Sequence, residues 1–363
     1  MNPLQIVIIS YNIYPVLSPR SFRTTELAKE LVKKGHKVTL YAKLIRDYDY
    51  TSFVETTGII LKNIGKFHEN SFFFTNIVGK IIRRLTEYPR IKLIPYIKAA
   101  IKAEENIDYL ISIAMPHTIH WGVGFSNLNR VQCWTADCGD PYMGNPYAAF
   151  HPFYFKWIEK KWCKKANFIT IPIEEAKDGY YTEFRDKIHV IPQGFDFSNI
   201  TLSNYKKNSV PTFAYSGVCY VPGRDITTFL EYLCSLKCNF RFIVYTKSTD
   251  LFMPFIERLG EKLILKDYVP REILLEELSK MDFLINIKND FEIQQPSKLI
   301  DYYITKRPIL EITSLFKETN TFDEFLNGNY VNKLTEKDIS NYEISNVANK
   351  FIELYNKKIF KNI

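Results

Sequence analysis

The sequence predicts an α/β protein made of two doubly wound, Rossmann-like domains with a cleft between them. Short apolar runs alternate with amphipathic helical segments along the chain, and this alternation breaks near residue 195 and then restarts. The length of 363 residues also exceeds what one hydrophobic core usually supports. We therefore expect an N-terminal domain at 1–195, a C-terminal domain at 196–343, and a helix at 344–363 that packs back on the first domain.

The first expected domain opens with a strand, a helix and a second strand. Residues 4–10 form a continuous apolar run, which is typical of a parallel strand that is covered on both faces. The helix is expected from Ser21 to Lys34, with Gly35 as its C-terminal cap. Its buried side is predicted to carry Phe22, Leu27, Ala28, Leu31 and Val32. Further strands are predicted at 36–41, 108–113, 131–135 and 168–171, and a further helix at 153–165.

The second expected domain follows a linker near residues 191–196. Its predicted strands lie at 212–216, 240–245, 263–265, 283–287 and 308–311, and its predicted helices at 225–236, 271–280 and 297–305. Residues 344–358 form the last predicted helix. Because strands that alternate with helices form parallel sheets, the two arrays predict two doubly wound domains.

Composition excludes several other classes of protein. Apolar residues make up 46% and charged residues 24% of the chain, as in folded soluble proteins. The sequence lacks both an apolar run of about 18 residues and the pattern of a signal peptide, so we expect a cytoplasmic protein. The six cysteines have no metal-ligand spacing, and neither G-x-G-x-x-G nor a P-loop motif is present. No nucleic-acid-binding module is recognisable, and we expect no nucleic-acid partner.

The positive charge is concentrated in the first half of the chain. The whole net charge of +8 lies before residue 196, and the stretch 80–102 holds seven basic residues and one acid, Glu87. Apolar pairs alternate with these cations, and three phenylalanines at 72–74 precede them. Such a segment can bind a phosphate-bearing ligand or lie on an anionic membrane surface, which would make the protein peripheral on the inner face of the plasma membrane. A basic face that is merely solvated is the alternative.

A helix start in the second half of the chain can receive a phosphate. Pro296 stands where the helix 297–305 begins, and Ser297 and Lys298 occupy its first turn. Free backbone N–H groups, the helix dipole and the Lys298 charge all favour an anion there. Asp301, one turn further on, can accept hydrogen bonds from two ribose hydroxyls. A surface pair of Lys298 with Asp301 is the alternative.

Four parts of the chain resemble the retaining group 1 (family 4) glycosyltransferases, which have the GT-B fold. SPRSFRTTELAKELVKKGHKV at 18–38 resembles the first loop, the first helix and the GHxV entry to the second strand. MPHTIH at 115–120 and ADCGDP at 136–141 resemble the paired PPHxxH and ADFRDPW segments of one subfamily. IHVIPQGFD at 188–196 is similar to KIxVIPNGxD, and QPSKLIDYYITKRPIL at 295–310 to PSKLxEYxxxGKPIL.

The resemblance implies a retaining glycosyltransferase that needs neither a metal ion nor a cofactor. Its donor would be a nucleotide-diphosphate sugar, and its acceptor a surface polysaccharide or a lipid-linked glycan. The implied donor-binding residues are Gly217, Arg224, Pro296, Ser297, Lys298, Leu299 and Asp301. The residues implied in catalysis are Asp140, His117, His120, Arg224 and Lys298. Contacts with the acceptor or the sugar are implied for Arg20, Arg23 and Asp137.

Three positions depart from the family pattern. Gly139 replaces an arginine and Tyr142 a tryptophan of the resembling subfamily, and Ile293 stands where many members carry a glutamate. These departures keep a second class of function open, a non-catalytic glycosyltransferase-like subunit that binds a nucleotide or a partner. A nucleotide-sugar 2-epimerase of similar fold is the enzymatic alternative.

Overall fold

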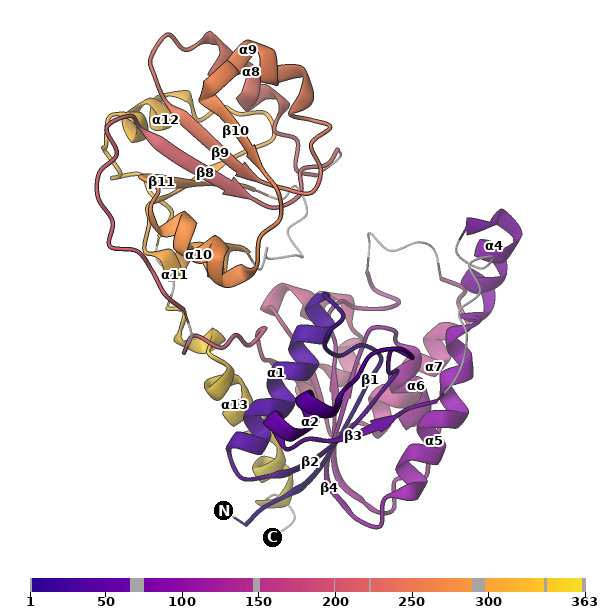
Figure 1. Cartoon of the computed structure of the whole chain (residues 1–363). Coiled ribbons are helices and arrows are strands. Elements are labelled where there is room, and N and C mark those ends of the chain that lie inside the picture. The colour runs from indigo at the N-terminus through magenta and orange to yellow at the C-terminus, as the bar shows by residue number, and fades with distance from the viewer. Residues whose placement is uncertain are drawn as a thin grey trace. The chain divides into compact units, whose positions relative to one another are not determined.

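The computed structural model of the chain describes residues 2–65, 75–145, 151–198, 200–221, 223–288, 298–335 and 338–360. It divides into two compact units, unit 1 (Met1–Asp196 with Asn341–Ile363) and unit 2 (Phe197–Ser340). Each unit contains its own parallel sheet, covered by helices (Figure 1). The predicted α/β fold of two doubly wound domains is thereby confirmed. The division falls after residues 196 and 340, whereas the sequence suggested boundaries after 195 and 343.

The sheet of unit 1 has seven strands among the described residues, and each neighbouring pair is parallel. In spatial order the strands are β3 (Ile60–Asn63), β2 (Lys37–Ala42), β1 (Gln5–Ser10), β4 (Ile107–Ile113), β5 (Val131–Asp137), β6 (Phe168–Ile171) and β7 (Ile188–Val190). The chain builds outward from β1 to β3 on one side and then from β4 to β7 on the other. The carboxyl ends of β1 and β4 therefore form the switch point at which doubly wound sheets bind ligands.

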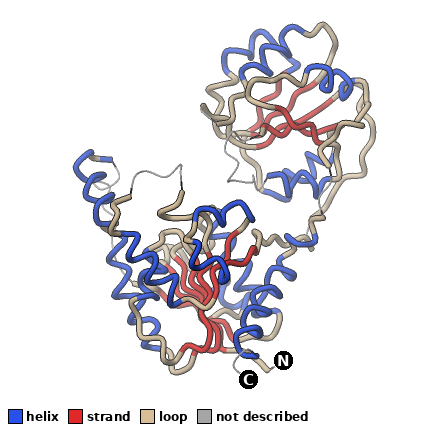
Figure 2. The backbone as a smooth tube through the Cα atoms, turned by 180° about the vertical axis from the view of Figure 1, so that it is seen from behind, coloured by secondary structure: helices blue, strands red, loops and turns tan. Residues whose placement is uncertain are grey.

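Helices cover both faces of this sheet, as the view from behind in Figure 2 shows. Among its described residues, the α-helices of unit 1 are α1 (Pro19–Lys33), α2 (Thr51–Thr57), α4 (Ile77–Thr86), α5 (Leu93–Ala103), α6 (Thr118–Gly124), α7 (Phe155–Lys165) and α13 (Ile344–Phe360). Ile6 and Ile8 of β1 join a core cluster with α1 and α13. Val7 and Ile9 join the other cluster, with α5, α6 and α7. This burial on both faces explains why the first strand is apolar at successive positions.

Local signals mark both ends of α1. The Ser18 hydroxyl accepts a hydrogen bond from the backbone N–H of Ser21 (3.2 Å), and Pro19 occupies the first helical position. Gly35 follows the helix with a φ of +89°, a conformation that glycine adopts at little cost. The predicted helix is thus present, and its start lies two residues earlier than expected.

The buried side of α1 differs from the prediction at its first turn. Leu27, Ala28 and Leu31 are fully buried, as expected. Phe22, which was expected on the same side, is 45% exposed, whereas Arg23 is 2% exposed. Arg23 lies one turn before Leu27 and therefore shares its face. The prediction for Phe22 was wrong because it followed hydrophobicity rather than the helical position.

The last helix packs on unit 1, although it follows unit 2 along the chain. Val347 and Phe351 of α13 are fully buried in the core cluster that also contains residues of β1, β2 and α1. The Arg23 guanidinium lies over the Phe351 ring, 5.0 Å from its centroid. Just before α13, the backbone N–H of Phe195 donates to the Tyr342 carbonyl at 2.8 Å. The C-terminal helix therefore completes the core of unit 1.

Unit 2 has a smaller parallel sheet with two core clusters of its own. Its strands lie in the order β10 (Leu263–Lys266), β9 (Arg241–Tyr245), β8 (Thr212–Ser216), β11 (Phe283–Ile287) and β12 (Ile309–Ile312). Its helices are α8 (Thr227–Ser235), α9 (Ile256–Leu259), α10 (Arg271–Ser279), α11 (Lys298–Thr305) and α12 (Thr319–Leu326). Phe213 and Tyr215 join one cluster, with α8 and α12, whereas Ala214 joins the other, with α10 and α11.

Some elements were not anticipated, and one predicted segment is only partly described. The sequence did not predict strands β3 and β7 or helices α2, α4, α5, α6, α9 and α12, whose patterns are short or mixed. Residues 289–297, which include Pro296, Ser297 and Ile293, lie outside the described residues. In the parts of the chain that are described, no helix is both long and apolar enough to cross a bilayer.

We predict that Phe351→Ala lowers the free energy of unfolding of unit 1 by about 3–5 kcal/mol, because it empties a fully buried site between α1, α13 and the sheet. All four tryptophans of the sequence lie in unit 1, so urea unfolding followed by tryptophan fluorescence reports on this unit. Glu353→Ala, on the exposed side of the same helix, is the control and should change the stability by less than about 0.5 kcal/mol. Equal stability of the two variants would mean that α13 is not part of the core.

Candidate functional site

The carboxyl edge of the unit 1 sheet gathers the residues that the sequence singled out in this part of the chain. These residues are Arg20 and Arg23 after β1, His117 and His120 after β4, and Asp137 and Asp140 at and beyond the end of β5. Loops that leave this edge are where doubly wound sheets bind ligands. Arg23, His120 and Asp137 are buried, His117 and Asp140 border an open pocket, and Arg20 is partly exposed.

Asp137, the last residue of β5, accepts hydrogen bonds from two arginines. Arg20 donates from Nη1 at 2.9 Å, and Arg23 donates from Nη2 at 2.9 Å and from Nε at 3.2 Å. The Thr170 hydroxyl of β6 donates a further hydrogen bond at 2.7 Å. Arg23 also donates from Nη1 to the Pro192 carbonyl at 2.6 Å. The network joins α1, β5, β6 and the segment that follows β7.

Most of this network is interior. The side chains of Asp137 and Arg23 are 1% and 2% exposed, whereas that of Arg20 is 18% exposed. Burial alone would raise the pKa of the Asp137 carboxyl, but the guanidiniums of Arg23 and Arg20 hold it below its usual value. Asp137 and Arg23 were expected to contact the sugar or the acceptor. Both side chains are engaged in holding the edge of the sheet together, and a contact of either with the sugar or the acceptor stays a prediction.

Gly139 makes room for Arg20. A Cβ atom at residue 139 would lie 2.8 Å from Nε and 2.9 Å from Nη2 of Arg20, closer than side chains tolerate. The resembling subfamily carries an arginine at this position. In this chain the Arg20 guanidinium, from α1, occupies the space next to Gly139. The loop therefore has a cation nearby, although it lacks the arginine of the subfamily.

His120 also lies in the interior. Its imidazole is fully buried, with Nδ1 at 2.8 Å from the Ser112 hydroxyl and Nε2 at 3.4 Å from the Cys138 sulfur. The Trp134 indole N–H donates to the same hydroxyl at 2.8 Å. Burial lowers the pKa of His120 to about 3, so the ring is neutral. The catalytic contact expected of His120 stays a prediction, and its ring is fully buried in the structure.

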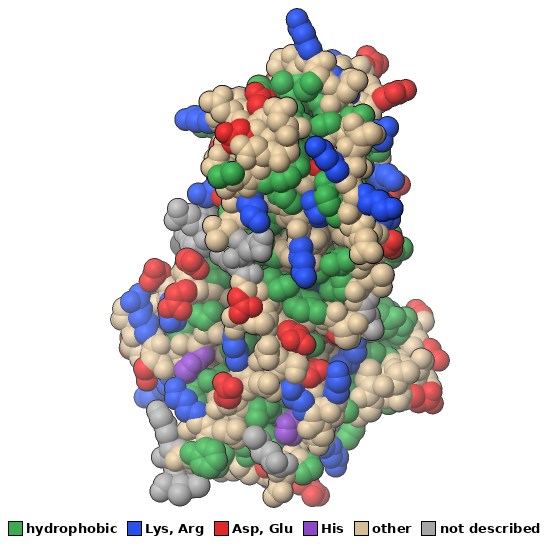
Figure 3. Space-filling model, turned by 90° about the vertical axis from the view of Figure 1, so that its left-hand side faces the viewer, with side chains coloured by type: hydrophobic (Ala, Val, Ile, Leu, Met, Phe, Trp, Pro, Cys, Tyr) green, Lys and Arg blue, Asp and Glu red, His purple; other side chains and the backbone are tan. Residues whose placement is uncertain are grey.

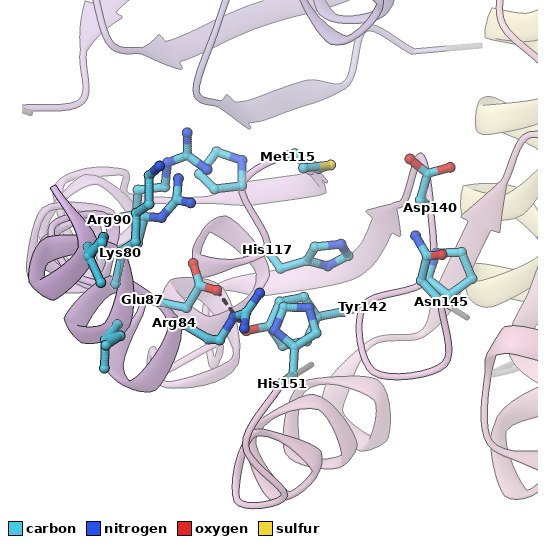
Figure 4. A pocket seen from close by; sticks show the side chains of 15 residues that line it. Lys80, Arg84, Glu87, Arg90, Met115, His117, Asp140, Tyr142, Asn145 and His151 are labelled. Carbon is cyan, nitrogen blue, oxygen red and sulfur yellow. Dashed lines mark hydrogen bonds between the residues drawn. The ribbon is translucent and has the colours of Figure 1, made fainter. Parts of the chain in front are cut away.

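His117 instead borders an open pocket of about 540 Å³. Three segments form this pocket: α4 with the turn after it, the loop after β4 and the loop after β5. Lys80 and Arg90 lie on one side of the pocket, Asp140 and Asn145 on the other, and His117 between them (Figure 4). The volume is in the range of small-molecule sites, roughly 300–1,000 Å³.

Aromatic and acidic side chains meet in this pocket. The Tyr142 hydroxyl donates to the Glu87 carboxylate at 2.9 Å. The Tyr142 ring stacks on that of His151, with 4.1 Å between the ring centroids, and its centroid lies 4.9 Å from that of His117. Burial raises the pKa of the Glu87 carboxyl, although the Tyr142 hydroxyl and nearby guanidiniums oppose this. The tyrosine is therefore anchored at both its ring and its hydroxyl.

His117 offers an unused hydrogen-bonding atom to the pocket. It is 6% exposed, and its Nδ1 has no hydrogen-bond partner among the described residues. Burial lowers the pKa of His117 well below its usual value, and the neighbouring His120 and His151 lower it further. A neutral imidazole can donate or accept one hydrogen bond at this atom, according to its tautomer.

Cations outnumber carboxylates around the pocket. Its described lining contains the carboxylates of Glu87 and Asp140 and the cations of Lys80, Arg83, Arg84 and Arg90. The basic stretch 80–102 was recognised from the sequence, but the pocket was not. The loops after β4 and β5 that complete the pocket are remote from this stretch in sequence. It also missed Glu87, Tyr142 and His151 as members of a site. The isolated position of Glu87 among basic residues was the one signal that could have drawn attention to it.

In unit 2 the loop after β8 is tied to α11. The Tyr302 hydroxyl accepts a hydrogen bond from the backbone N–H of Ser216 at 2.8 Å. Gly217 follows with a φ of +128°, and its N–H donates to the Tyr245 carbonyl at 2.9 Å. Asp301 directly precedes Tyr302 in α11. The structure thus brings Gly217 and the first turns of α11, which the sequence assigned to donor binding, to one edge of the second sheet.

Arg224 and Asp301 have partners that the sequence did not indicate. The backbone of Arg224 exchanges two hydrogen bonds with that of Tyr220, at 2.9 and 3.2 Å, which closes the loop after Gly217. The Arg224 side chain is half-buried, and its Nε has no hydrogen-bond partner within the described part of the chain. Asp301 accepts a hydrogen bond from Arg271 Nε at 2.8 Å, and burial raises the pKa of its carboxyl.

The remaining donor candidates lie at the start of α11. Lys298 is the first residue of this helix, and its side chain lies outside the described residues, as do Pro296 and Ser297. Leu299 is 6% exposed and packs in a core cluster, so only its backbone is placed to meet a ligand. Among the described residues of both units, no three His, Cys, Asp or Glu side chains converge as a metal site would require.

The sequence matches no family model and no curated protein. The fold, however, matches a glycosyltransferase from Rickettsia africae ESF-5 over 99% of both chains, with 13% identity and a TM-score of 0.65. TarM matches over 98% of this chain and 92% of its own, with 12% identity and a TM-score of 0.59. A putative UDP-N-acetylglucosamine 2-epimerase from Listeria monocytogenes matches over 99% and 98%, with 12% identity and a TM-score of 0.58.

These matches define the class of fold, the two-domain α/β architecture of GT-B glycosyltransferases. Two proteins with related folds were solved with ligands. Anabaena HepE contains UDP and glucose, with 8% identity and a TM-score of 0.56. A mutant of S. aureus TarM contains UDP, fondaparinux and alpha-GlcNAc-glycerol, with 12% identity and a TM-score of 0.57.

We predict that Asp137→Asn lowers the free energy of unfolding of unit 1 by about 3–5 kcal/mol at pH 7, because buried Arg23 loses its charged partner. The pKa of Asp137 is depressed in the folded protein, so its stabilisation is complete above the unfolded value of about 3.9 and is lost as the pH falls through the lower folded value. Wild-type protein should therefore lose more stability on acidification than the variant does.

Urea titrations between about pH 2 and pH 7, followed by tryptophan fluorescence, measure this difference. Asp178→Asn is the matched control, because Asp178 is 84% exposed and pairs with Arg185 on the surface of the same unit. It should shift the stability by less than about 1 kcal/mol. Indistinguishable stability of the two variants at every pH would rule out a structural role for the Asp137 network.

Proposed function

We propose that the protein is a retaining glycosyltransferase that moves a sugar from a nucleotide-diphosphate donor to a surface polysaccharide or a lipid-linked glycan. One observation carries this proposal. Each segment whose sequence resembles the group 1 glycosyltransferases contains or follows the carboxyl end of a strand, and the fold as a whole matches a glycosyltransferase over 99% of both chains. The strands concerned are β1, β4, β5, β7 and β11. These are the ends at which sheets of this kind bind ligands.

Unit 2 is the proposed donor-binding unit. The loop from Gly217 to Arg224 and the start of α11 would receive the diphosphate, and the UDP in HepE and TarM supports a nucleoside diphosphate as the leaving group. The charges of Arg224 and Lys298 would stabilise the diphosphate as it departs in the transition state. Because these two side chains supply positive charge, we propose that the reaction needs neither a metal ion nor a cofactor.

Unit 1 is the proposed acceptor-binding unit. His117 and Asp140 border its pocket, and the neutral His117 ring offers a hydrogen bond rather than a charge. Asp140 offers a carboxylate, which can accept a hydrogen bond from a sugar hydroxyl. The partly exposed guanidinium of Arg20 is the third candidate for this contact.

A nucleotide-sugar 2-epimerase is the second candidate function. The match to a putative epimerase from Listeria monocytogenes favours it, at a TM-score close to that of TarM. An epimerase would change the donor sugar without any acceptor. A glycosyltransferase would release nucleoside diphosphate only when an acceptor is present. Dependence on the acceptor therefore separates the two functions.

We predict that the protein, in the presence of a chelator, releases nucleoside diphosphate from one or more nucleotide sugars when crude lipid acceptor is added. Arg224→Gln should weaken nucleotide binding about ten- to a hundred-fold, which is the loss of one charge-assisted contact of about 1.5–3 kcal/mol. Arg241→Gln, an exposed arginine at the start of β9 in the same unit, is the control and should bind nucleotide like the wild type.

Each part of this experiment can contradict a different statement. Conversion of the donor sugar without acceptor would favour the epimerase, and nucleotide binding without any turnover would favour a non-catalytic subunit. Activity that disappears with chelator and returns with a divalent ion would refute metal independence. Equal nucleotide affinity of Arg224→Gln and Arg241→Gln would remove Arg224 from the donor site.

We also propose that unit 1 binds peripherally to an anionic membrane leaflet through α4 and its neighbours. The apolar residues of α4 fall at helical spacing and are all exposed: Ile77, Val78, Ile81, Ile82 and Leu85. The Tyr154 hydroxyl donates to the Leu85 carbonyl, which places the start of α7 beside α4. Phe153 and Trp157 there are 83% and 82% exposed. Exposed apolar and aromatic side chains among cations are typical of an interfacial surface.

The charge of unit 1 is not evenly distributed. On the face seen in the lower part of Figure 3, acidic and basic side chains are intermixed. The stretch 80–102, which runs through α4 and α5, has seven basic residues and one acid. Each Lys or Arg near an anionic leaflet contributes about 1 kcal/mol, which decays over about 8 Å at physiological salt. A few such contacts would support reversible binding.

We predict that the protein co-sediments with anionic vesicles at low salt, less at high salt, and little with neutral vesicles at any salt. Replacement of Arg83, Arg84, Lys92 and Lys98 by Gln should abolish this binding without reducing nucleotide affinity, because the donor residues lie in unit 2. The control replaces Lys206, Lys207, Lys247 and Lys266, exposed cations of unit 2, with Gln. Equal sedimentation of both variants would mean that the basic stretch is only a solvated face.

A further inference from the structure

The pocket beside α4 combines an excess of positive charge with an apolar border, a pairing that sugar hydroxyls alone do not require. On α4, Lys80 and Arg84 lie one turn apart, so both are on the same side of the helix, and both line the pocket. Both side chains are exposed, so neither is held in the core of unit 1. In Figure 4 they lie on the side of the pocket opposite Asp140.

The charge balance of the pocket suits a ligand with more than one negative charge. Four Lys and Arg side chains face two carboxylates in its described lining. A phosphate monoester carries about −1.5 to −2 at pH 7, and a diphosphate that links two groups carries one negative charge on each phosphate, whereas a sugar acid carries a single negative charge. Guanidinium groups bind phosphate oxygens through planar, charge-assisted hydrogen bonds. The electrostatics therefore favour a phosphate or a diphosphate over a neutral sugar.

An independent observation comes from the inner wall of the pocket. His117 is more than nine-tenths buried, lines the pocket, and has a ring nitrogen without a hydrogen-bond partner among the described residues. A buried polar atom without a partner is costly, and a ligand in the pocket can satisfy it. His117 and the cations of α4 line the same pocket, so one bound group can contact both.

The border of the pocket continues into an apolar surface. Ile77 and Ile81 line the pocket, yet they are 75% and 53% exposed and belong to the apolar side of α4. Val78 and Ile82 extend the same side away from the pocket. A ligand whose phosphate lies in the pocket could thus continue along α4 with a hydrocarbon chain, and burial of that chain would strengthen binding.

We propose that this pocket binds the diphosphate of the acceptor, and that the hydrocarbon chain of the same acceptor lies along Ile77 and Ile81. The inference rests on the proposed glycosyltransferase function, because it assigns the acceptor of that reaction to a phosphate-bearing lipid. The pocket recognises the charged junction between lipid and glycan, which is common to acceptors with different sugars.

Calorimetric titration of the full-length protein with inorganic pyrophosphate tests the charged part of this site. Lys80→Gln/Arg84→Gln should weaken binding at least about tenfold through the loss of charge-assisted contacts. Lys98→Gln/Lys102→Gln removes the same charge from exposed side chains of α5 outside the pocket, and should change the affinity by less than about twofold. A sugar acid with one carboxylate should bind at least about tenfold more weakly than pyrophosphate.

Three results would overturn the charged part of the proposal. These are the absence of saturable pyrophosphate binding, an equal loss in the two double variants, and binding of the sugar acid as tight as that of pyrophosphate. Arg224→Gln separates this pocket from the donor side in unit 2, and should leave unchanged the part of pyrophosphate binding that depends on Lys80 and Arg84. If only Arg224→Gln abolishes binding, the anion occupies unit 2 and the assignment to α4 fails.

Geranyl diphosphate, used below the concentration at which it aggregates, tests the source of the phosphate. It should bind about tenfold more tightly than pyrophosphate to the wild type. Ile77→Ser/Ile81→Ser should remove this preference and keep the pyrophosphate affinity, whereas Val78→Ser/Ile82→Ser should keep both. No preference in the wild type, or a preference that survives Ile77→Ser/Ile81→Ser, would overturn the lipid assignment. None of these titrations requires sugar transfer, so this proposal and the proposed function can fail separately.

Discussion

The carboxyl edge of unit 1 depends on one buried ion-pair network, in which two guanidiniums share the carboxylate of Asp137. Removing either kind of charge would leave the other unpaired away from water, which is far more costly than losing a surface pair. Arg23 extends the network, because it also bonds to the Pro192 carbonyl and lies over the Phe351 ring. One side chain thus connects the first helix, the central strands, the segment after β7 and the last helix of the chain.

This network leaves the chemistry of the edge to other side chains. Once Asp137 and Arg23 are paired and His120 is bonded inside the core, the polar groups that face the pocket come from the loops beyond the strands and from α4. The interior groups maintain the shape of the edge, and the exposed groups give it a positive charge. Unit 2 has a comparable tie, in which the neutral hydroxyl of Tyr302 holds the loop after β8 against α11.

The local features of the fold could be predicted because they depend on neighbours in sequence. A parallel strand buried on both faces must be apolar at successive positions, and the runs at 4–10, 212–216 and 283–287 have this property. Ser18 and Gly35 mark the ends of α1 through contacts within one turn of the helix. The alternation of strand and helix segments restarts after residue 195, which predicts a second sheet. The structure contains two sheets.

By itself, then, the sequence determined the two doubly wound sheets and the set of polar residues at their edges, since periodicity and capping are local. Only the tertiary structure decided which of these residues face solvent. Asp137 and Asp140 stand three residues apart, as do His117 and His120, yet only Asp140 and His117 border the pocket. The difference arises from partners elsewhere in the chain, such as Arg23 for Asp137. Exposure depends on those long-range contacts, and the pocket exists because α4, remote in sequence from the loop after β5, lies across from it.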